Sequence, residues 1–170
     1  LLTGPQGEGL SKRLGTLALR EMRAKGIAPE ALISLMARLG SSQPVELQSD
    51  IDAVYGSFDL SQFGSSPTKF EVEDLFPLTS RHLQSLSVSD VADDLRDIGV
   101  PEDLAEGFWT VVRDNISTLN DLAGWWTLCS KGAEPVISQE DRDFVSQAMA
   151  LLPEGPHNSD TWSSWTSAVK

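Results

Sequence analysis

The chain has 170 residues, and its 25 acidic and 13 basic side chains give it a formal charge of −12. A sequence pI of about 4.4 argues against a dedicated nucleic-acid-binding protein, because such domains usually have a pI above about 9. A single cysteine, Cys129, excludes an internal disulfide and a cysteine-based zinc site, and the absence of a long apolar run excludes a membrane span.

The residues favour helices along the whole chain, and a hydrophobic fraction of 40% is enough to pack them around a core. Thr16 is expected to cap a helix over residues 17–25 that ends at Gly26, and Pro29 to begin a second helix that ends at Gly40. Strands would show as a sustained alternation of apolar and polar residues, and the sequence has none. The predicted fold class is therefore all-α. Further helices are predicted over residues 71–86, 89–98, 101–116, 117–128 and 161–169. Asp50 is expected to cap a short helix that reaches Tyr55, and another helix is expected to follow Ser138 and to stop at Pro153.

Three residues in these helices carry local predictions. Pro77 falls inside the 71–86 pattern and is expected to kink or split that helix, because a proline removes one backbone hydrogen bond. Ser138 and Asp141 have the Ser-x-x-Asp spacing of a capping box. Asp160 is expected to cap the last helix.

Other side chains that could carry chemistry have a structural interpretation. Trp109 lies beside Phe108, and Trp125 and Trp126 lie between Leu122 and Leu128, so core packing is favoured over base stacking for these three, whereas Trp162 and Trp165 stay open. Cys129 is expected to be an inert small hydrophobe. The two histidines, His82 and His157, are expected at the surface rather than as ligands.

The net charge is unevenly distributed along the chain. Residues 1–40 hold six basic and three acidic side chains and have a charge of +3, whereas the 22 acidic and seven basic residues of 41–170 give −15. A basic N-terminal segment in an otherwise acidic chain can form a binding site for a polyanion that the net charge does not reveal. The alternative is that the uneven distribution has no function and that these charges simply lie on solvent-exposed helix faces.

A glycine-bearing loop, Gly9-Leu10-Ser11-Lys12-Arg13, precedes the first predicted helix. Glycine allows backbone N–H groups to approach a phosphate, lysine adds a mobile point charge, and arginine adds a rigid fork of donors. Such a loop is a weak signal alone, because two solvated cations in a loop would look the same.

The residues after this loop sharpen the interpretation. Leu10-Ser11-Lys12-Arg13 is followed by a helix, then by Pro29-Glu30-Ala31-Leu32 and by Arg38-Leu39-Gly40. This order resembles the region just after the catalytic fold of bacterial glutamyl-tRNA synthetase, a class I aminoacyl-tRNA synthetase, where a Lys-Leu-Ser-Lys-Arg-type signature loop leads into the same helices. The resemblance continues through residues 70–75, and Trp125-Trp126 and residues 161–166 resemble the α-proteobacterial type.

The resemblance implies the tRNA-binding C-terminal part of a glutamate–tRNA ligase, which activates glutamate with ATP and Mg²⁺ and transfers it to tRNA(Glu). Lys12 would contact ATP, and Gly9, Leu10, Ser11 and Arg13 would shape the loop, with Gly9 in the place of the family's first lysine. The catalytic fold and its His-Ile-Gly-His-type signature are not in this sequence. We therefore expect a fragment that is inactive alone and binds no cofactor or metal, from a cytoplasmic, monomeric enzyme with no membrane association.

The resemblance also implies an organisation. Residues 1–15 would be the signature loop and the end of the catalytic domain, 16–70 a helical connector similar to a stem-contact region, and 71–170 a C-terminally truncated, helical anticodon-binding region. The candidate tRNA contacts are basic residues, which could also be merely solvated: Arg20, Arg23, Lys25, Arg38 and Arg81.

Other functions stay open from the sequence. An acidic, all-helical protein-interaction module with a coincidental Leu-Ser-Lys-Arg is the alternative of a different class. Glutaminyl specificity or another class I synthetase is a third possibility. A truncated tRNA-modifying paralogue is disfavoured, because that relative lacks the helical C-terminal region.

Overall fold

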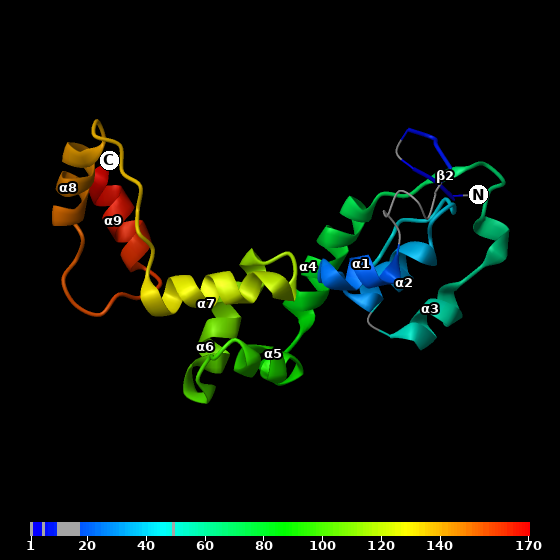
Figure 1. Ribbon diagram of the computed structural model, residues 1–170, viewed down its shortest axis with the longest axis horizontal. Helices are drawn as coiled ribbons and strands as arrows, with labels where there is room; N and C mark the ends of the chain where they lie inside the picture. The colour runs from blue at the N-terminus through cyan, green and yellow to red at the C-terminus, as the bar shows by residue number, and fades with distance from the viewer. Residues whose placement is uncertain (1, 5, 10–17, 49) are drawn as a thin grey trace. The chain divides into compact units, whose positions relative to one another are not determined.

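The computed structural model describes residues 2–4, 6–9, 18–48 and 50–170, which form two compact units (Figure 1). Unit 1 is Leu1–Lys131 and unit 2 is Gly132–Lys170. The boundaries expected after residues 15 and 70 stay predictions.

The described residues of unit 1 form helices, the loops between them, and one small sheet in which β1 (Leu2–Thr3) pairs in parallel with β2 (Thr68–Lys69). Single turns of 3-10 helix join its helices: η2 (Leu60–Gln62), η3 (Val72–Asp74), η4 (Val88–Val91), η5 (Arg113–Asn115) and η6 (Leu119–Asp121). The α-helices are α1 (Leu19–Ala24), α2 (Pro29–Met36), α3 (Ile51–Ser57), α4 (Leu75–Ser85), α5 (Ala92–Asp97), α6 (Glu102–Val112) and α7 (Leu122–Lys131). The predicted all-α class is confirmed.

Helix α4 belongs to both hydrophobic cores of unit 1. Its first half supplies Leu75 and Leu78 to a cluster with α1 and α2, and its second half supplies Leu83 to a cluster with α5, α6 and α7. The first cluster also contains Met22, Ile27, Ala28, Ala31, Leu35 and Phe70. The second also contains Val91, Leu95, Val100, Phe108, Trp109, Val112, Ile116 and Leu122. The two cores are therefore joined by one continuous helix.

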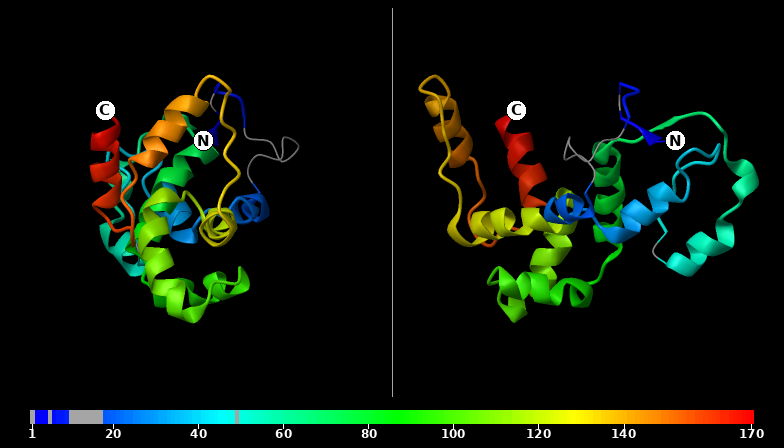
Figure 2. Two further views of the ribbon diagram at one scale, coloured as in Figure 1. Left: turned by 90° about the vertical axis from the view of Figure 1, so that its left-hand side faces the viewer. Right: turned by 45° about the vertical axis from the view of Figure 1, so that its right-hand side comes forward.

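Unit 2 consists of α8 (Arg142–Ala150) and α9 (Thr161–Val169), which lie side by side (Figure 2). The Trp165 indole Nε1 of α9 donates to the Ala148 carbonyl of α8 over 2.6 Å. Ala148 is the one buried hydrophobic residue found in this unit. Because so little apolar surface is buried, the unit depends on few contacts for its stability.

The turns and caps of the first helices follow the sequence. Gly26 has a φ of 78°, which suits a helix C′ position, and Pro29 opens α2. The Asp50 carboxylate caps α3 by accepting from the Asp52 N–H over 3.0 Å. Gly40 also has a positive φ, but α2 ends at Met36 and a turn covers the residues between. Thr16 lies outside the described residues.

The kink expected at Pro77 is wrong. The α-helical part begins at Leu75, after the 3-10 turn η3, so Pro77 is its third residue. The N–H groups of a first turn have no partner within the helix, and a proline there removes no hydrogen bond.

Neither predicted cap of unit 2 forms as expected. Ser138 Oγ donates to Asp141 Oδ2 over 2.7 Å and accepts from the Asp141 N–H over 3.2 Å, but Asp141 itself is the residue before α8, so the pair closes a local turn and the predicted capping box is wrong. Asp160 makes no capping bond through its side chain, so that prediction is wrong. Its N–H instead donates to Asn158 Oδ1 over 2.9 Å.

Candidate nucleic-acid interface

The predicted phosphate-binding loop falls largely outside the described residues. Leu10, Ser11, Lys12 and Arg13 are not among them, so Lys12 stays a prediction. Gly9 is described, and it forms an isolated antiparallel bridge with Thr3 of β1.

Helix α1 exposes two cations on one side and buries an apolar residue on the other. Arg20 and Arg23 are exposed and three residues apart, so their side chains are neighbours on the helix surface. Met22, which is 6% exposed, points into the first core and fixes which side of α1 faces solvent. Among the described residues, neither arginine has a carboxylate within 4.0 Å. Two unpaired guanidinium groups side by side can contact neighbouring phosphates.

The other predicted cations differ from this pair. Lys25 caps the C-terminal end of α1 and is exposed, and Arg81 is exposed on α4. Arg38 is half-buried, and its Nη1 donates to the Ser57 carbonyl over 3.0 Å. Arg38 therefore connects the end of α2 to the end of α3, which is a structural contact.

A row of contacts that the sequence did not predict fixes the α1–α2 pair to the rest of unit 1. We call it the seam, and it consists of four contacts made by every second residue from Ala24 to Glu30. The Ala24 carbonyl accepts from Asn120 Nδ2 over 3.0 Å, and the Ala28 N–H donates to Thr79 Oγ1 over 3.2 Å. Gly26 packs on Thr118, and Glu30 Oε2 lies 3.4 Å from His82 Nε2. The sequence indicated a turn at Gly26 and a helix start at Pro29-Glu30, but none of these four contacts.

The histidines and the cysteine have different environments. The His82 side chain is 14% exposed, so the surface position expected for it is wrong, whereas His157 is exposed as predicted. Cys129 is exposed and free, not buried as a small hydrophobe would be. In the part of the chain that the structure describes, no group of His, Cys, Asp and Glu side chains could hold a metal ion.

The tryptophans are mainly structural, as predicted for the second core. Trp109 is 2% exposed and its Nε1 donates to the Leu86 carbonyl over 3.0 Å. Trp126 is half-buried and packs edge-on against Phe108, with ring centroids 5.4 Å apart. In unit 2, Trp162 is 67% exposed.

Two carboxylates have pKa values below the usual 3.8. The hydrogen bond from the Ser87 hydroxyl lowers the pKa of Asp90, with smaller effects from the Ser87 N–H and the charge of His82. The hydrogen bonds of Ser61, first through its side chain, lower the pKa of Asp59. Both carboxylates cap turns, so their charge stabilises local structure rather than a reacting group.

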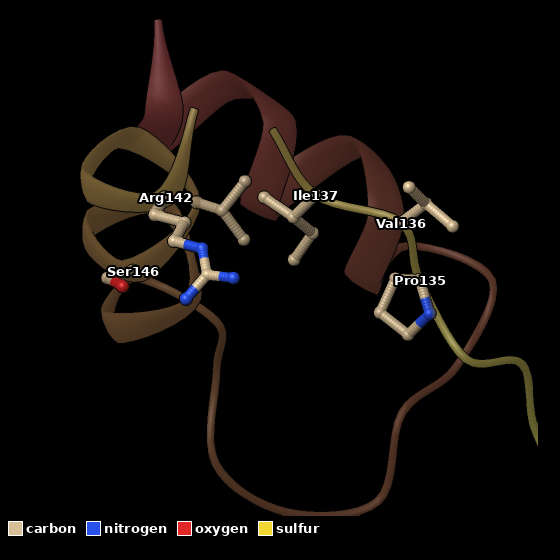
Figure 3. A pocket seen from close by; sticks show the side chains of 6 residues that line it. Pro135, Val136, Ile137, Arg142 and Ser146 are labelled. Carbon is tan, nitrogen blue, oxygen red and sulfur yellow. The ribbon is translucent and has the colours of Figure 1, made fainter. Parts of the chain in front are cut away.

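Unit 2 contains a groove of about 520 Å³ that sequence reasoning missed. Figure 3 shows the Arg142 guanidinium between α8 and the extended segment that carries Ile137. The remaining lining is mostly apolar: Pro135, Val136, Val145 and Ser146. No helix in the described ranges is long and apolar enough to cross a membrane.

Comparison with known proteins relates the entire chain to one kind of enzyme. It is 65% identical over 170 residues to "Glutamate--tRNA ligase 1" of Ruegeria pomeroyi, and 61% identical to "Glutamate--tRNA ligase 1" of Cereibacter sphaeroides. Each match covers 100% of this chain and 38% of the relative, so the chain spans well under half the length of these curated relatives. No family model matches the sequence.

Solved structures show the same fold. The crystal structure of a glutamate-tRNA synthetase from Elizabethkingia anophelis matches with a TM-score of 0.68 at 17% identity, over 99% of this chain and 40% of that one. A glutamate tRNA ligase from Elizabethkingia meningosepticum matches with a TM-score of 0.67.

Proposed function

Because the chain belongs to the glutamate–tRNA ligase family as a C-terminal segment, we propose that it is the part of such a ligase that binds and positions tRNA(Glu). The single observation that carries this proposal is the identity of 58–65% to glutamate–tRNA ligases over the whole chain. Arg20 and Arg23 support it, because they are exposed and no carboxylate of the described residues lies within 4.0 Å of them, and phosphate contacts need cations that are not already neutralised.

The full-length ligase would join glutamate to AMP with ATP and Mg²⁺, and then transfer glutamate to the tRNA. Charge builds on the phosphates during activation, so a fixed cation there lowers the barrier. Lys12 is the residue of this chain that we assign to that contact.

The proposal includes an arrangement of tasks along the chain. Residues 16–70 would contact the tRNA stem through α1, and residues 71–170 would belong to the anticodon-binding region. The ligase would work as a cytoplasmic monomer. An acidic protein-interaction module stays the competing function, and the next experiment separates the two.

Binding of tRNA(Glu) at several salt concentrations tests the function. A ligand held by phosphate contacts should show a logarithmic affinity that falls linearly with the logarithm of salt concentration. Arg20→Ala and Arg23→Ala should each weaken binding and reduce that slope by about one. Arg96→Ala is the matched control, because Arg96 is also exposed but already pairs with Asp93. If the chain shows no salt-sensitive binding at micromolar concentration, the tRNA-binding assignment is wrong.

A second test addresses Lys12 in a full-length ligase. Lys12→Ala should slow the formation of glutamyl-adenylate far more than it weakens tRNA affinity. Unchanged adenylate formation would remove Lys12 from the mechanism.

A further inference from the structure

Helix α1 is too short to hold its own direction. It has six residues, and isolated helices shorter than about 12 residues are at best marginal in water. It buries one side chain, that of Met22, and no side chain caps its first turn. One buried side chain fixes which side of the helix faces the core, but it leaves the helix free to tilt about that point. The direction of α1 therefore depends on a second contact.

The C-terminal end of α1 provides this second contact. The carbonyl groups in the last turn of a helix have no partner within the helix. The turn after α1 supplies local partners, among them the Ile27 N–H, which donates to the Met22 carbonyl over 3.0 Å. The last carbonyl of α1, that of Ala24, accepts instead from Asn120 Nδ2 over 3.0 Å. Of the four contacts in the seam, this is the one made by a residue of α1 itself.

Asn120 is held firmly on the other side of this contact. It lies in η6, a turn closed by a capping box between Thr118 and Asp121. Asp121 Oδ2 accepts from the N–H groups of Ser117 and Thr118 over 2.9 and 3.0 Å. Leu122 follows the turn directly and is 1% exposed in the second core. The Asn120 amide is therefore a preorganised donor that connects the second core to the end of α1.

We propose that Asn120 is a positioning residue for tRNA binding, because its amide sets the direction of the helix that carries Arg20 and Arg23. Arg23 directly precedes Ala24, and Arg20 lies about one turn earlier, so a tilt of α1 moves both guanidinium groups. When α1 tilts freely, only a fraction of the molecules present both cations correctly, and the apparent affinity falls by that fraction. This inference rests on the proposed function, to which the phosphate contacts of the two arginines belong.

Amide hydrogen exchange tests the contact without any RNA. The Ile27 N–H reports opening at the end of α1, because it donates to the Met22 carbonyl. So short a helix opens more easily than the rest of unit 1. Asn120→Ala should therefore lower the protection of the Ile27 N–H by about two- to tenfold, the factor that corresponds to the loss of one hydrogen bond.

Asn115→Ala is the matched control. Asn115 also lies in a 3-10 turn, is exposed, and donates through its Nδ2 to a helix carbonyl over 3.0 Å. That carbonyl belongs to Val111 of α6, the helix directly before the turn, so the control removes a similar bond without touching α1. It should leave the protection of the Ile27 N–H unchanged. Unchanged protection in Asn120→Ala, or equal losses in the two variants, would overturn the inference.

A tRNA-binding measurement then connects Asn120 to function. Asn120→Ala alone should weaken binding of tRNA(Glu) by about two- to tenfold. Combining Arg20→Ala with each asparagine variant gives two double-mutant cycles. The factor by which Arg20→Ala weakens binding should be the same in the Asn115→Ala chain as in the wild-type chain. In the Asn120→Ala chain it should be at least about twofold smaller, because Arg20 is already displaced there.

The outcomes separate this inference from the proposed function. If the wild-type chain binds tRNA(Glu) and Arg20→Ala weakens binding equally in both asparagine variants, Asn120 does not position Arg20 and the inference alone is wrong. A general loss of stability would not produce the expected difference, because the matched control removes a similar hydrogen bond. If the wild-type chain binds no tRNA, the proposed function fails and the positioning role fails with it.

Discussion

The energetic cost of placing a side chain at the close contact between Gly26 and Thr118 can be measured by comparing alanine substitutions at two glycines of unit 1. Gly26 and Gly99 have similar φ angles, of 78° and 82°. A Cβ atom at Gly26 would lie 2.8 Å from Thr118 Cβ, whereas one at Gly99 would have no neighbour within 4 Å. Alanine at either position must adopt a left-handed conformation, so only the contact distinguishes the two substitutions.

The magnitudes follow from these two effects. The left-handed conformation costs an L-residue about 1–2 kcal/mol, and the smaller entropy of the unfolded alanine chain returns about half of that. Gly99→Ala should therefore lower the free energy of unfolding by about 1 kcal/mol. At Gly26 an overpacking cost of about 1–3 kcal/mol is added. Thr118 cannot move aside easily, because it is 4% exposed and its N–H donates to Asp121 Oδ2 over 3.0 Å.

Urea unfolding followed by far-UV circular dichroism measures both losses. Gly26→Ala should lose about 2–4 kcal/mol in total, with an m-value equal to that of Gly99→Ala. Equal free-energy losses in the two variants would refute the reasoning, because they would leave no cost for the contact with Thr118. Gly132→Ala, at φ 77° with nothing within 4 Å, gives a second control in unit 2.

Two further predictions concern the second core and the acid response. Trp109→Ala should lower the free energy of unfolding by about 3–5 kcal/mol, because it leaves a cavity at a buried site. Trp162→Ala should change it by no more than about 0.5 kcal/mol, because Trp162 is exposed. Thermal unfolding of both variants checks this prediction, and similar losses in the two would contradict it. The pKa of Asp90 is lowered in the folded chain, so its stabilisation is present above the usual value of 3.8 and is lost as the pH falls through the lower, folded-state pKa. Asp90→Asn should accordingly lose less stability than the wild-type chain in an acid titration from pH 5 to pH 2, and parallel titration curves would show that the carboxylate has no such role.

The helices of this chain were largely predictable because their signals are local. Gly26, Pro29 and Asp50 act through their own backbone angles or through neighbours a few residues away, and each has its expected position. Pro77 was misjudged because the apolar pattern runs through η3 into α4, and periodicity does not separate a 3-10 turn from a first α-helical turn.

The candidate site was predictable in residue type but not in arrangement. The spacing of three residues places Arg20 and Arg23 on one side of the helix, and the apolar Met22 lies on the other side. Burial of Met22 therefore leaves both arginines exposed. The partners of Arg38 and His82 come from α3 and α2 and depend on tertiary packing. No spacing rule relates Glu30 to His82, because the two residues are 52 positions apart and lie on different helices.

One helix at the centre of two cores makes their stabilities interdependent. If the second half of α4 opens, Leu75 and Leu78 lose the support of a continuous helix, and the first cluster loosens with the second. Opening of unit 1 should therefore be cooperative rather than stepwise from one core to the next. A ligand that contacts only α1 would also slow hydrogen exchange around Trp109, since binding to the folded state stabilises everything that opens with it.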